Sequence, residues 1–473
     1  MYKFKLILPE DSFLNDLQEI VRAFFPYLQI DNEASDFLCC LFSFENGSLL
    51  CDIESSFWGK ETKQTTIKEK SESDKKRLIK RFLKNSLYSY ISEKTNISLP
   101  YGSLTGVRPT KLYRELTKTT ENPNKYLKEA FSVTQSRVSL IEKCVRNQEN
   151  IINDNPLNIG LFLNIPFCPS RCSYCSFIST EVFRIKKELP LYVTCVKKDI
   201  EAAFEIIKEK NYKVTSIYVG GGTPSSIGKD MLNELLFPLF DYGVEFTVEI
   251  GRPDTIDKGI LDVLKKNNVT RISINPQTFH QKTLDIIGRK HSVEQIYTSY
   301  NLAKSYGFDI NMDLIANLSG ESYEDFCFSV DEAIKLSPEN ITIHTLSLKR
   351  GSVLTLDGTK KEAGGEAYRM LDYAYGVLEK NGYFPYYMYR QKNMFDNLEN
   401  TGFCKDGKAC KYNIDMMEES ASIIGLGCGA MSKYVFNDKI ERFSSPKGFR
   451  EYCERIEKTV SDKKDFYLNQ PKY

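Results

Sequence analysis

Apolar runs of strand length alternate with amphipathic helical stretches from about residue 158 to residue 350. Six runs have the length and composition of strands: Gly160–Ile165, Val214–Gly220, Glu245–Ile250, Arg271–Asn275, Asp309–Ile315 and Ile341–Leu346. The stretches between them, such as Lys186–Lys208 and Val293–Tyr306, carry apolar residues at helical spacing. This alternation predicts βαβ units, a parallel sheet and an α/β fold class. Six repeats instead of eight predict a partial (β/α)6 barrel over residues 156–350, with the carboxyl ends of its strands on one rim.

The regions on either side of the repeats follow other patterns. An N-terminal α+β domain is predicted over residues 1–95, with strand-like runs near 2–8, 37–43 and 48–53 and helical spacing over 11–25 and Asp74–Ile91. Residues 96–155 are predicted to be a connector. Residues 351–473 predict a C-terminal α+β extension, with a helix at Gly364–Lys380.

Composition limits the classes of protein that fit this chain. Apolar residues make up 41% of the 473, which is enough for a sizeable core. The formal net charge of +1 provides no global field for binding nucleic acid or a membrane surface. No apolar stretch approaches the ~20 residues of a membrane span, and acidic residues follow Met1 too soon for a signal peptide. Thirteen cysteines favour thiols and a metal site over a disulfide framework, so we expect a cytoplasmic protein.

Two basic runs have both a structural and a functional interpretation. Lys60–Lys84 is rich in lysine and arginine, and a solvated linker and helix face is favoured over a site for an anionic partner. The run Leu104–Leu112 contains Thr-Gly and Arg-Pro, which predict a tight turn before a helix. Arg108 and Lys111 either hold an anion there or belong to a capped turn.

Three cysteines, Cys168, Cys172 and Cys175, stand directly after the first predicted strand of the barrel. Three thiolates this close in sequence can wrap one small cluster, and a [4Fe-4S] cluster usually takes four protein thiolates. With three, one iron stays open for a small-molecule ligand. The alternative is a zinc knuckle or three unrelated thiols. The spacing Cys-x3-Cys-x2-Cys, with an aromatic residue before the last cysteine, resembles the radical S-adenosylmethionine (SAM) superfamily, in which the open iron chelates SAM.

The resemblance implies a SAM site on the same rim. Gly220-Gly-Gly-Thr-Pro224 follows the second strand, where glycines let backbone amides approach a ligand closely. Gly221, Gly222 and Thr223 match the loop that contacts SAM in this superfamily. Glu249 ends the third strand, and a carboxylate there can accept hydrogen bonds from an ammonium group. The resemblance gives Glu249 the amino group of SAM.

Three more polar residues lie at or after later strands. Gln277 can hydrogen-bond ribose or carboxylate, Arg289 is the candidate partner of the SAM carboxylate, and Asp313 is the candidate for the ribose hydroxyls. Taken singly, each also fits a surface salt bridge or a turn cap. Their repeated occurrence at strand ends favours a common site.

Several local runs narrow the resemblance to one family. Thr105–Lys111, Glu249–Asp254, Arg390–Met394 and Asn397–Asn400 look like the HemZ-like subgroup of the oxygen-independent coproporphyrinogen III oxidase (dehydrogenase) family. The resemblance implies a reaction of heme biosynthesis in which SAM is cleaved to a 5′-deoxyadenosyl radical that takes a hydrogen from a substrate propionate. Loss of CO2 and one electron then leaves a vinyl group, and two such steps convert coproporphyrinogen III to protoporphyrinogen IX. The partners implied are this tetrapyrrole and a one-electron donor such as flavodoxin or ferredoxin.

Three positions depart from the oxidase pattern. The family carries a cysteine, a tyrosine and a histidine where this chain has Phe177, Phe162 and Asn164. A heme chaperone branch of the same family also has phenylalanine at the first of these positions. Two alternatives therefore stay open, a heme-binding chaperone and a radical SAM enzyme that modifies or degrades heme. His344 is the leading axial-ligand candidate in both.

A substrate with four carboxylates calls for cations near the rim. The candidates are Arg252, Arg350, Arg390 and Lys392, and ordinary surface charge is the alternative for each.

The C-terminal region, 351–473, is expected to cover the substrate. Its aromatic run Tyr383–Tyr389 either stacks on a tetrapyrrole or packs in the core, and the core is favoured. Cys404, Cys410 and Cys428 offer a weak signal for a second cluster and are more typical of free thiols.

Overall fold

The computed structural model describes residues 3–9, 13–26, 28–67, 71–177, 179–347, 365–391, 397–436 and 439–471. The chain divides into two compact units. Unit 1 comprises Met1–Lys143, Lys361–Tyr368 and Tyr389–Glu399, and unit 2 comprises Cys144–Lys360, Arg369–Met388 and Asn400–Tyr473. None of the helices in the described ranges combines the length and the apolar character needed to cross a membrane.

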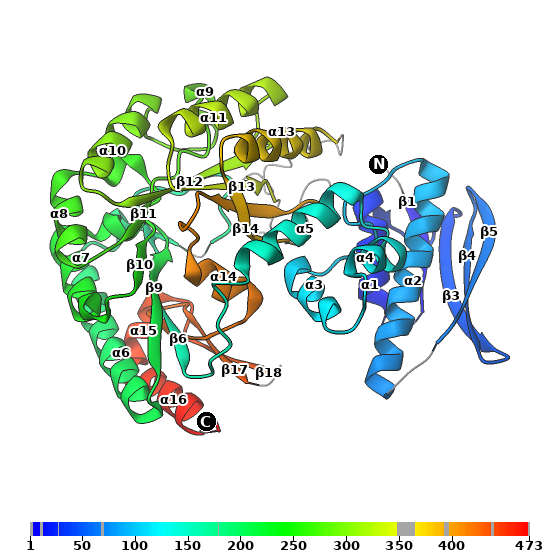
Figure 1. The fold of residues 1–473 in the computed structure, drawn as a ribbon, viewed down its shortest axis with the longest axis horizontal. Helices are drawn as coiled ribbons and strands as arrows, with labels where there is room; N and C mark the ends of the chain where they lie inside the picture. Colours follow the sequence, from blue (N-terminus) through cyan, green and yellow to red (C-terminus); the bar gives the residue numbers. More distant parts are fainter. Residues whose placement is uncertain are drawn as a thin grey trace. The chain divides into compact units, whose positions relative to one another are not determined.

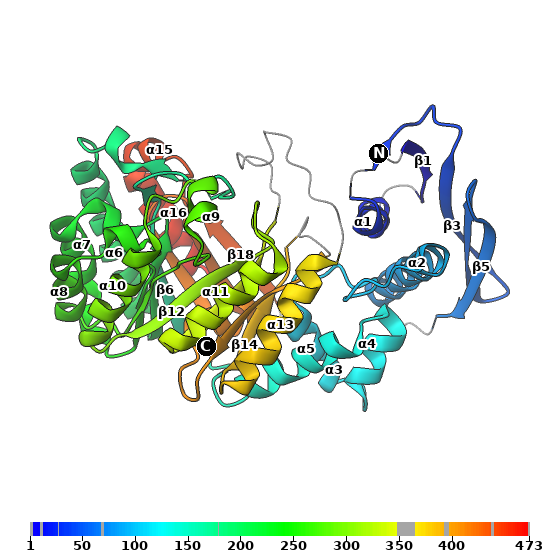
Figure 2. The ribbon, with the colours of Figure 1, turned by 90° about the horizontal axis from the view of Figure 1, so that it is seen from above.

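Unit 1 contains a five-stranded sheet in the order β2-β1-β3-β4-β5. Its strands are β1 (Lys3–Ile7), β2 (Gln29–Ile30), β3 (Phe37–Glu45), β4 (Ser48–Ser55) and β5 (Gly59–Thr66). β1 is parallel to both of its neighbours, whereas β3, β4 and β5 form an antiparallel meander. Helices α1 (Leu14–Phe24) and α2 (Glu72–Thr95) lie beside this sheet (Figure 2). They share one core with it, in which Leu17, Leu49 and Leu87 are fully buried.

Arg390 joins separate runs of sequence inside unit 1. Its backbone N–H donates to the carbonyl of Val107 over 2.8 Å, and its guanidinium donates to the carbonyl of Leu104 and, over 2.8 Å, to that of Asn397. The guanidinium also lies 4.1 Å from the centre of the Tyr101 ring. Hydrogen bonds from Arg390 therefore stabilise the turn before α3 (Pro109–Thr117). The next helices are α4 (Pro123–Phe131) and α5 (Gln135–Gln148).

Unit 2 contains an eleven-stranded sheet in the order β14-β15-β13-β12-β11-β10-β9-β6-β16-β17-β18. The six predicted strands form its middle: β6 (Asn158–Ile165), β9 (Lys213–Gly221), β10 (Glu245–Val248), β11 (Arg271–Ser273), β12 (Asp309–Ala316) and β13 (Asn340–Thr345). All six are parallel. The α/β fold class is confirmed. β14 and β18 are the edge strands of this order, and no pairing joins them among the described residues.

The C-terminal strands extend the sheet at both edges. They are β14 (Phe384–Tyr389), β15 (Asn400–Cys404), β16 (Ser422–Leu426), β17 (Met431–Phe436) and β18 (Lys439–Ser444). β15 pairs antiparallel with β13, whereas β16 pairs parallel with β6 at the other edge. The sequence pattern did not predict this division of the C-terminal region between two edges of the sheet.

Helices cover the outer side of the curved sheet, as Figure 1 shows for α6, α7, α8, α10 and α11. The helices of unit 2 after α5 are α6 (Leu189–Lys210), α7 (Lys229–Leu236), α8 (Lys258–Lys266), α9 (Gln281–Ile286), α10 (Val293–Ser305), α11 (Tyr323–Leu336), α13 (Glu366–Lys380), α14 (Lys411–Glu418), α15 (Phe449–Glu454) and α16 (Ile456–Leu468). Apolar strand residues such as Leu163, Val219 and Ile343 are fully buried. On β12 and β13 the alternate residues Asn311, Asp313 and Thr342 are polar and hydrogen-bond one another on the inner side.

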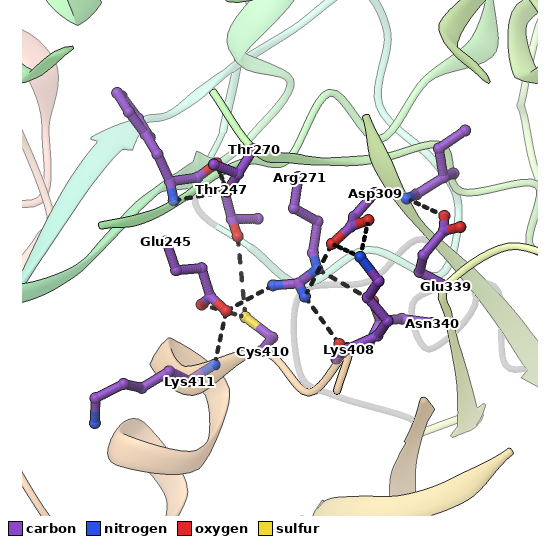
Figure 3. A network of polar contacts seen from close by, with 12 residues as sticks. Glu245, Thr247, Thr270, Arg271, Asp309, Glu339, Asn340, Lys408, Cys410 and Lys411 are labelled. Atoms are coloured by element: carbon purple, nitrogen blue, oxygen red, sulfur yellow. Dashed lines mark hydrogen bonds and ion pairs between the residues drawn. The ribbon is translucent and has the colours of Figure 1, made fainter. Parts of the chain in front are cut away.

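The amino ends of the parallel strands are joined by a polar network around Arg271 (Figure 3). Its guanidinium donates to Glu245 over 2.8 Å, to Asn340 over 3.1 Å and to the carbonyl of Lys408 over 2.8 Å. The thiol of Cys410 donates to the other oxygen of Glu245 over 3.2 Å. Burial, followed by Glu245, raises the pKa of Cys410 to about 12, so this thiol is neutral. This end of the sheet is opposite the predicted rim.

Candidate active site

The three cysteines lie in a loop between two short strands. Cys168 ends β7 (Phe167–Cys168), which pairs in parallel with β8 (Thr180–Glu181) so that Cys168 is opposite Glu181. The backbone N–H of Cys175 donates to the carbonyl of Cys172 over 3.1 Å, and that of Ser173 donates to Ile287 over 3.0 Å. The loop is therefore attached both to itself and to the segment after α9.

The three thiols are partly buried and affect one another electrostatically. Burial raises the pKa of Cys168 and of Cys175 above its ordinary value, and the neighbouring thiols add to the shift. Neutral thiols are therefore favoured until a positively charged metal centre binds. Within the part of the chain that the structure describes, no three His, Cys, Asp or Glu side chains converge as a preformed site for a metal ion.

The glycine run after β9 lies against the cysteine loop. The N–H of Gly222 donates to Ile165 over 2.9 Å, and that of Thr223 donates to Phe167 over 2.7 Å. A Cβ at Gly222 would stand 2.5 Å from the carbonyl oxygen of Phe167. Because that oxygen belongs to the backbone and cannot move aside, this position requires glycine. The hydroxyl of Thr223 donates to the thiol of Cys168 over 3.7 Å. Gly222 and Thr223 therefore support the strand that carries the first cysteine.

Glu249 is a partly buried carboxylate at the rim without a cationic hydrogen-bond partner among the described residues. The hydroxyl of Tyr218 donates to it over 3.4 Å. Burial raises the pKa of Glu249 to about 8, and the nearby Asp313 carboxylate adds to this effect, while Tyr218 and Arg289 partly offset it. A ligand with an ammonium group would supply the missing positive charge, so Glu249 fits the amino group of SAM.

Arg289 connects the cysteine loop to two strand ends. Its guanidinium donates to the carbonyl of Asn275 over 2.6 Å, to that of Gly251 over 3.2 Å and to the hydroxyl of Tyr174 over 3.2 Å. Tyr174 is the aromatic residue just before the last cysteine. The guanidinium is thus largely engaged by protein oxygens, and its predicted contact with the SAM carboxylate stays a prediction.

Gln277 and Asp313 lie side by side at the rim. The N–H of Gln277 donates to the carbonyl of Asp313 over 2.9 Å, and the N–H of Ile315 donates to Gln277 over 3.1 Å. Gln277 has a φ of +67°, a left-handed conformation that is unusual for a residue other than glycine. The Asp313 side chain accepts from Asn311 over 2.8 Å and lies 3.5 Å from Nε2 of His344.

The predicted substrate cations have other partners or lie outside the described residues. Arg252 binds both oxygens of Asp254 over 2.8 Å and donates to the Ser170 hydroxyl over 3.0 Å. It therefore secures the cysteine loop through Ser170. Arg390 is buried in unit 1, held by the carbonyl groups named above. Arg350 and Lys392 lie outside the described residues.

Tyr218 and Tyr412, which the sequence did not single out, stack with Phe162 on the inner side of the sheet below Glu249. The rings of Tyr218 and Tyr412 stack with their centres 4.5 Å apart, and Phe162 stacks on Tyr412 at 6.1 Å. Tyr218 stands two residues before Gly220, so strand alternation could have placed it on the same face. Tyr412 comes from α14 and had no such signal.

Asn164 connects the rim to the C-terminal glycine-rich run. Its side-chain amide donates to the carbonyl of Cys428, and the hydroxyl of Tyr192 donates to the carbonyl of Asn164 over 2.6 Å. Cys428 follows β16, whereas Cys410 lies at the amino ends of the strands. These two thiols therefore lie at opposite ends of the parallel sheet.

Comparison with known proteins agrees with this geometry. Residues 165–333 match the model of the radical SAM superfamily. The coproporphyrinogen III oxidase HemN from Escherichia coli, described as a radical SAM enzyme, shares the fold: its TM-score is 0.52 at 18% identity, covering 67% of this chain and 73% of that one. Fold and site thus define a radical SAM protein, a class that uses a [4Fe-4S] cluster and SAM.

Two relatives indicate which family within the radical SAM proteins this chain resembles. The oxygen-independent coproporphyrinogen-III oxidase-like protein HemZ of Bacillus subtilis is 36% identical over 490 residues, covering 98% of this chain and 96% of the relative. The heme chaperone HemW of Haemophilus influenzae is 26% identical over 330 residues, covering 66% of this chain and 82% of the relative. The chain belongs to the family of HemZ, the oxygen-independent coproporphyrinogen-III oxidase-like proteins.

Proposed function

We propose that the protein is a SAM-dependent oxidoreductase that decarboxylates coproporphyrinogen III to protoporphyrinogen IX in heme biosynthesis without oxygen. The observation that carries this proposal is the likeness to HemZ over nearly the whole of both chains. The partly buried Glu249, on the same rim as the cysteine loop, supports the SAM-dependent part of the reaction, because it lacks the cation that SAM would bring.

Each rim residue has one role in this proposal. Cys168, Cys172 and Cys175 hold the cluster, and Glu249 binds the amino group of SAM. Gly221, Gly222 and Thr223 bring the loop after β9 against that site, while Gln277, Asp313 and Arg289 orient the ribose and carboxylate. When bound, the cluster and SAM supply a one-electron cleavage that produces a carbon radical.

The inner side of the sheet restricts where a tetrapyrrole can enter. Phe162, Tyr218 and Tyr412 form a stacked aromatic floor below Glu249. The Arg271 network closes the amino ends of the strands. The reacting propionate is therefore proposed to reach SAM from the carboxyl ends, past Asp313 and His344.

His344 is proposed to bind the carboxylate of that propionate. The Asp313 carboxylate lies 3.5 Å from Nε2 of the imidazole, and no hydrogen bond to Nδ1 is present in the described part of the chain. An imidazole that carries both ring protons can donate Nδ1–H to an anionic group.

A heme-binding role is the second candidate, because the HemW relatives are named heme chaperones. In that role His344 would be the axial ligand. The position of Asp313 favours the decarboxylase role over the heme-binding role. Asp313 lies at Nε2 of His344, so heme iron would have to bind Nδ1. Nδ1 is the more hindered nitrogen, because it is next to the carbon that attaches the ring to the side chain.

One anaerobic assay separates the two roles. Reconstituted protein is incubated with SAM, a one-electron reductant and coproporphyrinogen III. The products are then separated by chromatography, and their masses are measured by mass spectrometry. We expect 5′-deoxyadenosine and the loss of two CO2 units from the substrate. 5′-Deoxyadenosine with unchanged coproporphyrinogen III would exclude this substrate. Tight heme binding that is lost in His344→Ala, without any turnover, would favour the chaperone role.

A further inference from the structure

The segment that leaves the cysteine loop exposes large apolar side chains to solvent. Phe177, Phe183 and Leu191 are 67%, 64% and 57% exposed, and they are the three most exposed large apolar residues in the described part of the chain. All three fall within fifteen residues of one another, directly after the last cysteine. Exposed apolar groups gathered in this way mark an interaction surface rather than ordinary scatter.

The strand pairing keeps these residues near the cysteines. Phe177 stands two positions after Cys175. β8 pairs with β7 so that Glu181 is opposite Cys168, and Phe183 lies in the 3-10 turn Val182–Arg184 that follows β8 directly. Leu191 is in the first turn of α6. A protein that docks here approaches the cluster along a short path.

The same segment carries a local excess of positive charge. Its exposed cations are Arg184, Lys186 and Lys187, and Arg171 is a further exposed cation inside the cysteine loop. Its two carboxylates already have cationic partners, because Glu181 pairs with Arg184 over 2.8 Å and Glu188 pairs with Arg450 over 2.8 Å. The chain as a whole has a net charge of only +1, so this excess is a property of the surface and not of the protein.

We propose that this donor face, defined as Phe177, Phe183, Leu191, Arg171, Arg184, Lys186 and Lys187, docks an acidic one-electron carrier protein. The proposal rests on the radical SAM chemistry of the cluster and not on the identity of the substrate. One electron passes from the reduced flavin or iron–sulfur centre of the carrier to the oxidised cluster, and no atom or proton moves with it. Exposed apolar residues interleaved in sequence with exposed cations suit such a transient encounter, because the charges speed association and a small apolar contact permits release.

Stopped-flow reduction without substrate tests the donor face. Reconstituted full-length protein is mixed without air with reduced flavodoxin, and bleaching of the cluster absorbance gives a second-order rate constant. We expect Lys186→Glu/Lys187→Glu to lower that constant about tenfold at low salt, with the difference shrinking as salt screens the charges. Phe183→Ser/Leu191→Ser should lower it several-fold at every salt concentration.

Control variants and a second reductant test whether a lower rate constant is specific to the donor face. Phe237→Ser removes another half-exposed phenylalanine, and Lys258→Glu/Lys266→Glu reverses two exposed charges on α8. Both controls should keep the wild-type rate. Reduction by dithionite, which needs no docking surface, should be the same in every variant.

Three outcomes would overturn the proposal. Equal flavodoxin rates in the donor-face variants and the wild type would show that the carrier docks elsewhere. Slower dithionite reduction in the variants would show damage to the cluster site instead. A change in self-association or in binding to anionic vesicles, with the flavodoxin rate unchanged, would assign the face to a second copy or to a membrane. The reduction experiment contains no coproporphyrinogen III. Its rate constants therefore test the donor face whether or not the protein carries out the proposed decarboxylation.

Discussion

Oδ2 of Asp313 lies 3.5 Å from Nε2 of His344, across the neighbouring parallel strands β12 and β13. The pairing places His344 opposite Ile315, so Asp313 is its diagonal neighbour on the inner face. One step toward the amino ends, Thr342 donates to Asn311 over 3.2 Å, and Asn311 donates to Asp313 over 2.8 Å. This ladder of polar side chains holds the carboxylate that orients the imidazole.

Replacement of His344 by glutamine should weaken substrate binding more than chemistry. We expect the KM for coproporphyrinogen III to rise about tenfold, because a charge-assisted hydrogen bond to a carboxylate contributes about 1.5–3 kcal/mol. Cleavage of SAM without substrate should be unchanged. His280→Gln is the control, since its Nε2 lies 2.9 Å from a backbone oxygen, that of Asp325, on the outer side. A tetramethyl ester of the substrate should bind wild type and His344→Gln equally, and a remaining difference would contradict the assigned contact.

The affinity for SAM should rise with pH because Glu249 must ionise to bind an ammonium group. Its pKa in the free protein is raised to about 8, mainly by burial, so at pH 6 the carboxyl is neutral. We expect the affinity to increase about tenfold between pH 6 and pH 7 and about fivefold more by pH 8, and to level off above about pH 9, with release of a proton. Calorimetry in buffers of different ionisation enthalpy measures this proton. Glu249→Gln should bind SAM more weakly and without this pH dependence.

The stability of the free protein should change with pH in the opposite direction. The folded pKa of Glu249 lies above its unfolded value of ~4.3, so stability is lost as pH rises from about 4.5 to about 8. The loss is on the order of 4 kcal/mol, because the buried carboxylate ionises without a partner. Urea unfolding at pH 5 and pH 8.5 should show a smaller difference in Glu249→Gln. An equal difference in both proteins would place the titrating group elsewhere.

Loss of one loop cysteine should remove the cluster. Cys172→Ala leaves two thiols in the loop, so we expect iron and sulfide to fall to a small fraction of the wild-type content after reconstitution. SAM cleavage should be lost with them. Cys327→Ala is the control, because that half-buried thiol lies on α11, away from the loop. Full iron content in Cys172→Ala would contradict the ligand assignment.

The buried ion pair of Lys463 and Asp199 should hold the C-terminal helix in place. Both side chains are fully buried, and Asp199 also accepts from the N–H of Gly427 over 2.9 Å and from the hydroxyl of Tyr452 over 2.9 Å. Lys463→Met leaves this carboxylate without its cation, so we expect a loss of about 3–5 kcal/mol in the free energy of unfolding. Asp199→Asn/Lys463→Met should recover part of the loss. Unfolding followed by circular dichroism in urea measures both changes.

The positions of most elements in the barrel could be predicted from local pattern. All six predicted strands are present, and the predicted helix Val293–Tyr306 is α10, Val293–Ser305. Strands that pack one face against helices require apolar residues on that face, and amphipathic helices require apolar residues at helical spacing. Both patterns can be recognised from the order of residues along the chain. The cysteine loop could also be identified from the sequence, because three ligands that a single loop supplies to one small cluster must be close in sequence.

Residue order along the chain was enough to predict the parallel repeats and to locate the three closely spaced cysteines and the acidic residue at the end of the third strand. Which of the predicted cations have partners inside the protein became known from the fold, since Arg252 and Arg390 contact groups distant in sequence. It also decided that β15 and β16 join opposite edges of one sheet, and that Asp313 lies beside His344. The physical reason is that alternation along a strand determines which face a side chain occupies, whereas its neighbour on that face depends on register and strand order.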